Sequence, residues 1–452
     1  MKVLKLTPIV GLLACTSLSS SDDGGVDDGS VDIDTGLTDS GKDTSSDATS
    51  DVVTEVGADS GVTTYNDVAS SSFWKAFDIK PGSNGIAAGY QGGAFDGKYI
   101  YLANNANGMG YTGVIARHDT TMSLSVWDFF NAATADATLG GMYGATFAGT
   151  KVYFTSTTNP GGGVGVAVGV YDTAKAFNQN ASWQAFSVTT LNPGTGGLCG
   201  SAFDGKYLYV TPLWYGQNQP NGTVARYDTT QPFNMGWTSF NVAIAQIDAN
   251  ARGFCGAVYA APYIYFAPNA YGVVVRYDTT KVFTAPASYE TFNATSAIGA
   301  GAHGYWGGAF DGKYVYLVPG LDGVNANGPT SMFLRHDTSQ PMSAWENYDL
   351  TDADANAKGF IGAGFDGKRI FLVPSYSSTL LAYDTSAPFN QSTSYKKFVT
   401  TSADVNAKSF AGSVFDGRYL YLIPGLGAQS VVLQFDAKSP ASMPPGFSGS
   451  FY

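Results

Sequence analysis

The sequence predicts an all-β protein built as a seven-bladed β-propeller, with four antiparallel strands in each blade. A short core, Phe-Asp-Gly-Lys or a degenerate form of it, occurs seven times, starting at Phe95, Phe147, Phe203, Tyr259, Phe310, Phe365 and Phe415. A second mark is an apolar run that ends in an aromatic residue or histidine followed by aspartate. It also occurs seven times, at Asp119, Asp172, Asp228, Asp278, Asp337, Asp384 and Asp436. Equal counts of two marks indicate seven repeated units.

A third mark predicts how the ring of repeats is closed. Pairs of aromatic residues spaced three apart follow each of the first six repeats, but no such pair follows Asp436. One pair, Trp74 and Phe77, stands instead ahead of the first repeat. We therefore expect residues 73–78 to supply the outermost strand of the seventh blade, because an open solenoid would need capping repeats.

The strands within one repeat follow from its composition. Small residues such as Gly92, Gly93 and Ala94 precede each core and suit an innermost strand, because blades converge on the axis. The Asp-Gly pair predicts a tight hairpin turn, and the alternating run that follows it, as in residues 99–102, predicts the second strand. Arginines that recur just before the aromatic-Asp mark are expected to join neighbouring blades by ion pairs or stacking; they are Arg117, Arg226, Arg276 and Arg335.

Residues 252–292 show a base, an apolar strand, Tyr-Asp and then an aromatic pair, an order that resembles the kelch-type propeller unit. The resemblance covers about residues 73–437. The sequence departs from it at the end of the second strand, where kelch units carry Gly-Gly and this chain has Val318-Pro319-Gly320 or Val373-Pro374-Ser375. The resemblance therefore implies a kelch-like propeller architecture rather than membership of that family.

Residues 1–15 predict a bacterial lipoprotein signal peptide. Lys2 and Lys5 precede an apolar run that ends at Cys15 and is too short to span a bilayer as a helix. The ending Leu-Leu-Ala-Cys resembles the lipobox, which implies acylation of Cys15 and a membrane anchor. Thr16 follows where an inner-membrane protein would carry aspartate, so we expect the outer membrane, with a periplasmic or cell-surface orientation. An ordinary secretory signal is the alternative.

Residues 16–68 predict a disordered acidic linker. Residues 16–65 contain eleven aspartates, one glutamate and one lysine, with no aromatic residue before Tyr65, so they cannot bury a core. The signal carries +2 and the linker −11 of the total charge of −12, which leaves −3 for residues 66–452. A nearly neutral propeller over residues 69–441, with a C-terminal tail over 442–452, excludes nucleic acid as a partner. We expect a monomer.

Function is expected on the face that carries the loops between second and third strands, because those loops vary while the Asp-Gly turns do not. Two residues before the inner strand, four consecutive blades carry a base: Arg252, His303, Lys358 and Lys408. Bases that converge at the mouth of a channel would attract carboxylate or sulfate. A structural interpretation is equally open, because Asn-Ala precedes three of these bases, which could simply cap local carbonyls.

Other candidate residues lie around the same face. His303 departs from the repeat and, with Tyr305, is the candidate acid or base, whereas His118 and His336 replace a repeated tyrosine and are expected to be structural. Aromatic residues suited to stacking on sugars are Trp214, Tyr215, Tyr271 and Tyr376. Cys199 and Cys255 occupy equivalent places on neighbouring inner strands, which are close enough to allow a disulfide.

Two functions are consistent with these residues. The first is a cell-envelope binding module for a glycan, an anionic polymer or a partner protein. The second is a polysaccharide-active enzyme, a uronate-polymer lyase or a glycosidase, in which Arg252 or Lys358 neutralises a uronate while His303 or Tyr305 takes the proton. We favour binding, because no convincing acid–base pair is present. No zinc-ligand spacing, catalytic serine motif or phosphate loop occurs, so no metal or cofactor is expected. A purely structural role in an envelope complex stays open.

Overall fold

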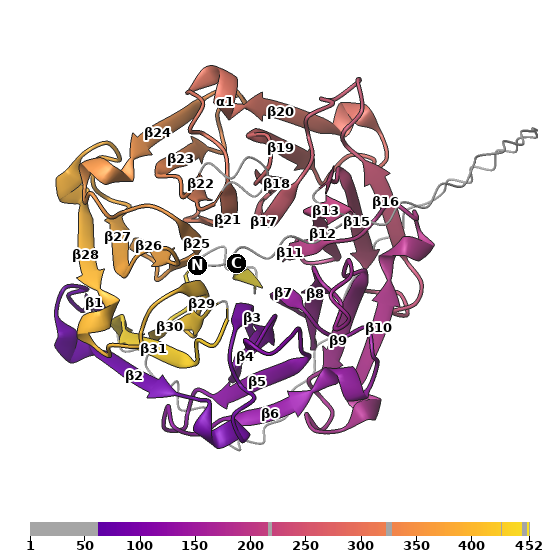
Figure 1. The fold of residues 1–452 in the computed structure, drawn as a ribbon. Helices are drawn as coiled ribbons and strands as arrows, with labels where there is room; N and C mark the ends of the chain where they lie inside the picture. Colours follow the sequence, from indigo (N-terminus) through magenta and orange to yellow (C-terminus); the bar gives the residue numbers. More distant parts are fainter. Residues whose placement is uncertain (1–61, 216–218, 322–327, 426, 445–449, 452) are drawn as a thin grey trace, which may run out of the picture. The chain divides into compact units, whose positions relative to one another are not determined.

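The computed structural model describes residues 62–215, 219–321, 328–425, 427–444 and 450–451. The predicted signal peptide, and the predicted linker up to residue 61, lie outside these ranges. The described chain forms seven four-stranded antiparallel sheets arranged as blades around one axis (Figure 1). The predicted fold class is thus confirmed. None of the helices in the described ranges is long and apolar enough to cross a membrane.

Six blades follow the chain from the innermost strand outward, and the seventh uses a strand from the N-terminal side. Blades 1 to 3 comprise β3 (Tyr90–Phe95), β4 (Tyr99–Asn104), β5 (Val114–Asp119) and β6 (Asp128–Asn131); β7 (Met142–Ala148), β8 (Lys151–Ser156), β9 (Ala167–Asp172) and β10 (Trp183–Ser187); β11 (Leu198–Phe203), β12 (Tyr207–Pro212), β15 (Thr223–Asp228) and β16 (Trp237–Asn241). Blades 4 to 6 comprise β17 (Phe254–Ala260), β18 (Tyr263–Pro268), β19 (Val273–Asp278) and β20 (Tyr289–Asn293); β21 (Tyr305–Phe310), β22 (Tyr314–Pro319), β23 (Met332–Asp337) and β24 (Trp345–Asp349); β25 (Phe360–Phe365), β26 (Arg369–Pro374), β27 (Thr379–Asp384) and β28 (Tyr395–Val399).

Short elements connect the blades or lie beside them. The remaining paired strands outside the seventh blade are β1 (Thr64–Tyr65) with β32 (Lys438–Ser439), β13 (Trp214–Tyr215) with β14 (Gln219–Pro220), and β33 (Ser450–Phe451). The helical turns are η1 (Ser71–Phe73), η2 (Pro81–Ser83), η3 (Ala132–Thr134), η4 (Asn180–Ser182), η5 (Val188–Thr190), η6 (Pro286–Ser288), α1 (Ala294–Ala297), η7 (Leu350–Asp352), η8 (Ser392–Ser394) and η9 (Thr400–Ser402).

Ring closure joins the two ends of the described chain in blade 7. This blade comprises β29 (Phe410–Phe415), β30 (Tyr419–Pro424), β31 (Val431–Asp436) and β2 (Trp74–Asp78). Strand β2 is antiparallel to β31, with Trp74 opposite Phe435 and Asp78 opposite Val431. The prediction that residues 73–78 complete the seventh blade is therefore confirmed.

A second contact between the termini lies beside blade 6. Strand β1 pairs with β32, which places Tyr65 opposite Lys438, although Tyr65 falls within the range expected to be linker. Arg369 holds this N-terminal segment in place, because it donates hydrogen bonds to the carbonyls of Asn66 and Ala437. The same arginine pairs with the buried Asp366. The ordered fold thus begins before residue 69.

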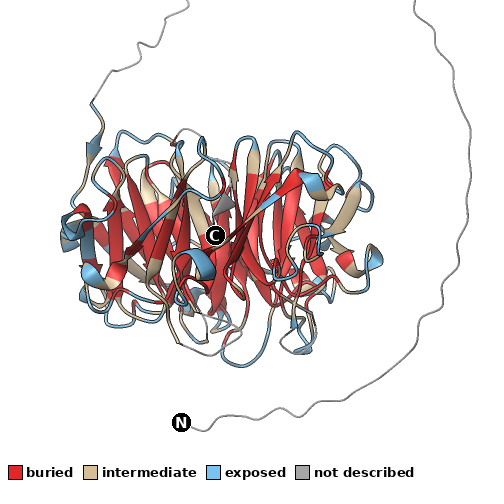
Figure 2. Ribbon diagram, turned by 90° about the horizontal axis from the view of Figure 1, so that it is seen from above, coloured by how far each residue is buried: buried red, intermediate tan, exposed pale blue. Residues whose placement is uncertain are grey.

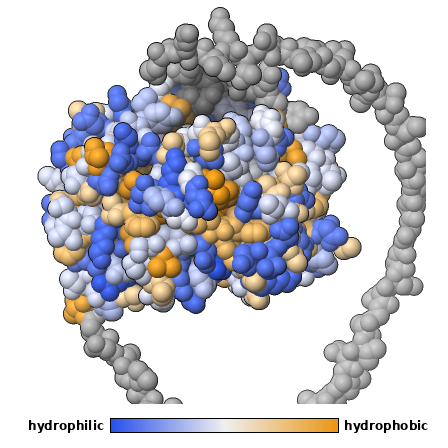
Figure 3. All heavy atoms as spheres, turned by 60° about the horizontal axis from the view of Figure 1, so that its bottom comes forward, coloured by the Kyte–Doolittle hydropathy of each residue, from blue (hydrophilic) through white to orange (hydrophobic). Residues whose placement is uncertain are grey.

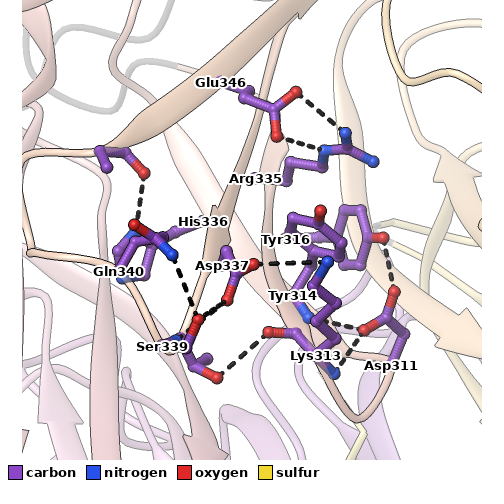
Figure 4. Close-up of polar contacts among 12 residues, drawn as sticks. Asp311, Lys313, Tyr314, Tyr316, Arg335, His336, Asp337, Ser339, Gln340 and Glu346 are labelled. Carbon is purple, nitrogen blue, oxygen red and sulfur yellow. Dashed lines mark hydrogen bonds and ion pairs between the residues drawn. The ribbon is translucent and has the colours of Figure 1, made fainter.

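The Asp-Gly turns are held by the aspartate side chain. In blade 5, Asp311 Oδ1 accepts hydrogen bonds from the backbone N–H groups of Lys313 (2.8 Å) and Tyr314 (2.6 Å), while Oδ2 accepts one from the Tyr316 hydroxyl (2.6 Å; Figure 4). Lys313 also pairs with Asp337 on the neighbouring strand (3.4 Å). The same aspartate bonds recur at Asp96, Asp204 and Asp416. The core motif therefore encodes the turn and fixes the second strand against it.

Glycine on the inner strands allows neighbouring blades to meet at the axis. A Cβ on Gly92 would lie 2.8 Å from Gly144 Cα, and a Cβ on Gly144 would lie 2.8 Å from Gly200 Cα. No side chain fits at those separations. Buried strands therefore run through the disc, while exposed loops cover its two faces (Figure 2). Hydrophilic and hydrophobic residues intermingle over the part of the surface shown in Figure 3.

Arginine residues join blades and two histidines have structural roles, as the sequence predicts. The Arg335 guanidinium lies over the rings of Tyr314 (4.3 Å) and of Phe389 in the next blade (4.4 Å). Buried His336 donates from Nδ1 to the Ala344 carbonyl (2.9 Å) and stacks on Trp345. In other blades a tyrosine hydroxyl makes the corresponding bond to a carbonyl, as Tyr383 does to Ala387. His118 and His336 are therefore structural.

Candidate functional site

The inner strands of all blades begin on one face of the disc, which also carries the loops between second and third strands. We call it the loop face, and the opposite face, with the Asp-Gly turns, the turn face. On the loop face each inner strand is preceded by a residue in the left-handed conformation, with φ between 56° and 74°: Gly89, Gly141, Gly197, Gly253, Gly304, Gly359 and Ser409. This bend directs the chain from one blade into the next. The four predicted bases stand immediately before it in blades 4 to 7.

The Asn-Ala lead before three of these bases belongs to a backbone turn. In blade 6 the Asp354 carboxylate accepts a hydrogen bond from the Asn356 N–H (3.0 Å). The Ala357 N–H donates to the Asp354 carbonyl (2.8 Å), and the Lys358 N–H donates to the Asn356 carbonyl (3.0 Å). Equivalent turns start at Asp248 and Asp404. Because the turn uses only the backbone of the basic residue, it explains the Asn-Ala lead but not the positive charge.

The four bases have two kinds of environment. Arg252 is half-buried with its guanidinium over the Tyr271 ring at 5.0 Å, and His303 is 8% exposed and packs against Gly272. Lys358 and Lys408 are exposed on the adjacent blades 6 and 7. Within the described ranges neither lysine side chain forms an ion pair or a hydrogen bond, so neither caps a local carbonyl.

Lys397, which was not among the predicted site residues, pairs with the acid that could otherwise neutralise Lys358. Its Nζ lies 2.8 Å from Asp354 Oδ2. This hydrogen bond, together with the one from the Asn356 N–H, holds the pKa of Asp354 below its usual range. The carboxylate nearest Lys358 in sequence is thus neutralised by a different lysine. The register of blade 6 decides this, because Lys397 comes from its outermost strand, β28.

The predicted aromatic residues lie at different depths on the loop face. Tyr376 is 49% exposed and packs against Gly359, next to Lys358. Tyr271 is half-buried beneath Arg252, and half-buried Trp214 packs toward the axis. Tyr215 contributes its backbone to β13, and its side chain lies outside the described part of the structure. Tyr376 is therefore the predicted aromatic residue best placed to contact a ligand beside a lysine.

The axis is closed by a set of residues that the sequence analysis missed. The second residue of each inner strand points inward, and six of them form one cluster, which we call the axial floor: Tyr143, Cys199, Cys255, Trp306, Ile361 and Ala411. Tyr143 and Trp306 come from blades 2 and 5, yet their ring centroids lie 6.1 Å apart. Cys199 and Cys255 form the disulfide that the sequence allowed. In the sequence, each of these six residues comes directly before the glycine at the third position of its inner strand, and this position could have identified them.

Strand β33 occupies the axis on the other side of the axial floor. Phe451 pairs with Gly93 of β3 and with Ala145 of β7, so the C-terminal strand inserts between blades 1 and 2. It joins their sheets into one of nine strands. The sequence predicted that the bases of blades 4 to 7 converge at the mouth of a channel. In the described part of the structure the axis is not open below them. They surround a closed floor, because side chains and the C-terminal strand fill the space that converging blades leave.

The two candidate proton-transfer residues differ in access. Tyr305 is fully buried in the core between blades 4 and 5, and burial raises the pKa of its hydroxyl well above the usual value. A substrate on the loop face does not contact this hydroxyl. His303 keeps a small exposed fraction, whereas Tyr305 has none. Acid–base chemistry by this pair has no support in the geometry.

Comparison with known proteins supports the fold. No protein-family model matches the chain, and no curated protein matches its sequence. A streptogramin B lyase structure aligns with a TM-score of 0.54 and 12% identity over 80% of this chain and 97% of the other. Virginiamycin B lyase from Staphylococcus aureus, as an inactive variant with quinupristin, gives a TM-score of 0.54 and 11% identity over 80% and 98%.

A propeller domain whose name indicates no lyase is also similar in architecture. The Swd1 β-propeller domain of Myceliophteria thermophila aligns with a TM-score of 0.50 and 9% identity, over 78% of this chain and 98% of that domain. Identities this low establish the shared propeller and nothing about ligands or activity. Function must therefore be argued from the side chains of the loop face.

Proposed function

We propose that this protein is a cell-envelope lipoprotein that binds an anionic glycan polymer on its loop face. The observation that carries the proposal is the uncompensated charge of Lys358. Its side chain is exposed, and the carboxylate that begins its turn is already paired with Lys397 at 2.8 Å. Lys408 is exposed at the same position of the adjacent blade and forms no ion pair within the described residues, so two ammonium groups stand one blade apart. That spacing suits a polymer with repeated negative charges better than a single small anion.

Aromatic side chains supply the second part of the site. Tyr376 is half-exposed and packs against Gly359, the residue that follows Lys358. A sugar ring carries apolar C–H groups that stack on an aromatic face while its acidic groups face the lysines. Arg252 over Tyr271 extends the basic surface to blade 4. The loop face thus offers a positive, aromatic surface over a closed axial floor.

Acylation of Cys15 would hold this surface at the outer membrane, where acidic polysaccharides occur. Metabolic labelling with an alkyne-tagged fatty acid tests the anchor. We expect label in the wild-type protein and none in Cys15→Ser. Label in neither protein would leave a secreted propeller, with the glycan proposal unaffected.

Binding is tested with polygalacturonate, heparin and neutral dextran at two salt concentrations. We expect salt-sensitive binding of an acidic polymer, weakened roughly 2- to 30-fold by Lys358→Ala plus Lys408→Ala, because each exposed charge contact contributes about 0.2–1 kcal/mol. The matched control is Lys206→Ala plus Lys313→Ala, which removes the same charge from the turn face. An equal loss of polymer affinity in the two double variants would show that only the net charge of the protein matters, and would reject the loop-face site.

The enzyme alternative is less well supported. A uronate lyase needs a base that reaches the C5 proton, and Tyr305 is fully buried. Incubation with polygalacturonate, with absorbance of the unsaturated product as the readout, distinguishes the two functions. We expect binding without a rise in absorbance.

A further inference from the structure

Four blades carry an arginine two residues before the aspartate that ends the third strand, and in three of them a carboxylate faces it across the sheet. Register places the acid of the fourth strand directly opposite: Arg117 opposite Asp128, Arg276 opposite Glu290, and Arg335 opposite Glu346. The corresponding ion pairs measure 2.7, 2.7 and 2.9 Å. In blade 5 the pair is two-pronged, with Arg335 Nε also donating to Glu346 (3.1 Å; Figure 4).

Blade 3 breaks this rule. Arg226 lies opposite Thr238, and within the described residues no carboxylate pairs with it. Its guanidinium is nevertheless held as in the other blades, over the Tyr207 ring at 4.2 Å and the Phe283 ring of blade 4 at 4.6 Å. Nη1 also donates to the Tyr277 hydroxyl (3.3 Å). The Arg226 guanidinium is therefore fixed in place. The N–H groups that pair with a carboxylate in Arg117, Arg276 and Arg335 have no carboxylate partner in Arg226 within the described residues.

The acids around Arg226 have other partners. Lys206 pairs with Asp228 (3.5 Å) and Lys281 pairs with Asp278 (3.1 Å). The Asp204 carboxylate accepts hydrogen bonds from two backbone N–H groups of its own turn and from the Tyr209 hydroxyl. Within the described residues the Arg226 guanidinium therefore pairs with no carboxylate, although it lies between two aromatic rings, where guanidinium–carboxylate bonds are strong.

The equivalent place at the junction of blades 1 and 2 is a cavity of about 440 Å³. Its lining includes Arg117, Asp128, Ala176 and Phe177. At the junction of blades 3 and 4, Val282 takes the place of Ala176 and is 67% exposed. By this equivalence an exposed apolar side chain lies on the side of Arg226 from which a ligand would approach.

We propose that Arg226 anchors a second binding site, which takes an aspartate or glutamate side chain of a partner polypeptide. The carboxylate would occupy the place that Asp128, Glu290 and Glu346 take on the equivalent arginines. An acidic side chain is favoured because the three occupied positions each hold one, and because the exposed Val282 suits the aliphatic part of a peptide. The site adjoins the turn face, so it is independent of the loop-face proposal.

The test uses the whole protein with its seven arginines labelled with ¹⁵N, so that each Nε–H group gives its own NMR signal. Arg226→Gln assigns the signal of Arg226. N-acetyl-glutamate N-methylamide is the probe, the corresponding glutamine derivative is its neutral control, and glucuronate represents acidic sugars. We expect a saturable shift of the Arg226 signal with the glutamate probe, and none with the glutamine derivative.

Thr238→Glu supplies the missing carboxylate from within the chain. We expect it to abolish the response and to raise the thermal midpoint, whereas Thr238→Val, which leaves the site open, keeps the response. A response that persists in Thr238→Glu, or that the neutral probe reproduces, would overturn the site. A response to glucuronate without one to the glutamate probe would overturn the polypeptide as ligand. Lys358→Ala plus Lys408→Ala should leave the shift unchanged.

Discussion

Trp74, near the start of the described chain, stacks on Phe435, near its end, with ring centroids 4.5 Å apart. The same indole stacks on Phe398 of blade 6 at 4.4 Å, and its Nε1–H donates to the Val68 carbonyl (2.9 Å). One side chain of β2 thus contacts β31 of blade 7 and also blade 6. The closure of the ring depends on this contact.

Trp74→Ala should therefore lower the free energy of unfolding by about 3–5 kcal/mol, the usual cost of removing a buried aromatic ring. Denaturant unfolding followed by fluorescence measures it. Lys75→Ala on the same strand is the control, because Lys75 is exposed. An unchanged midpoint in Trp74→Ala would show that the ring closes without this strand.

Gly144→Ala should destabilise the protein by about 1–3 kcal/mol through overpacking. The added methyl group would lie 2.8 Å from Gly200 Cα and 3.1 Å from Thr155 Oγ1, and both neighbours are fixed in inner strands. Gly110→Ala is the matched control, because a Cβ there meets no atom within 4 Å. Equal thermal midpoints for the two variants would contradict the close approach of blades 2 and 3.

Reduction of the Cys199–Cys255 disulfide should lower stability by about 4 kcal/mol, because the bond restrains a segment of 56 residues in the unfolded chain. Unfolding with and without reductant measures the loss, and Cys199→Ser plus Cys255→Ser should reproduce it. The double variant should also respond no further to reductant. Identical curves for oxidised and reduced wild type would argue against the bond.

Acid should destabilise the protein from about pH 6.5 downward. Burial lowers the pKa of His118 and His336 below the ordinary value of 6.5, more than their carbonyl partners raise it. The unfolded chain therefore binds protons first as the pH falls, so stability is complete above pH 6.5 and declines until the folded-state pKa is passed. Free energies of unfolding between pH 8 and pH 5 report this decline.

His118→Tyr plus His336→Tyr should flatten that dependence, because tyrosine fills the equivalent place in four other blades and stays uncharged over this range. Aspartates with lowered pKa, such as Asp337, lose their contribution only as the pH falls below 3.8 and do not affect the comparison. An equally steep decline in the double variant would assign the acid sensitivity to other groups.

The sequence by itself determined the blade count, the strand order and the closing strand. These follow from short-range chemistry that each repeat carries within itself. Asp311 accepts hydrogen bonds from the backbone of its own turn, and the Asp-Gly pair forms the hairpin within one repeat. The position of Trp74 ahead of the first repeat indicates that the outer strand of the last blade comes from the N-terminal side. The structural roles of His118 and His336 were predictable in the same way, because they replace a repeated residue.

Only the tertiary structure decided what meets across the repeats. The axial floor unites side chains from six blades, and no local pattern shows that Tyr143 and Trp306 meet or that Phe451 returns to the axis. The pairing of Lys397 with Asp354 joins residues 43 positions apart, and the rings that hold Arg226 come from two blades. Hydrogen bonds within one repeat follow from the sequence of that repeat. Contacts between side chains of different repeats depend on how the blades pack, which the sequence of one repeat does not show.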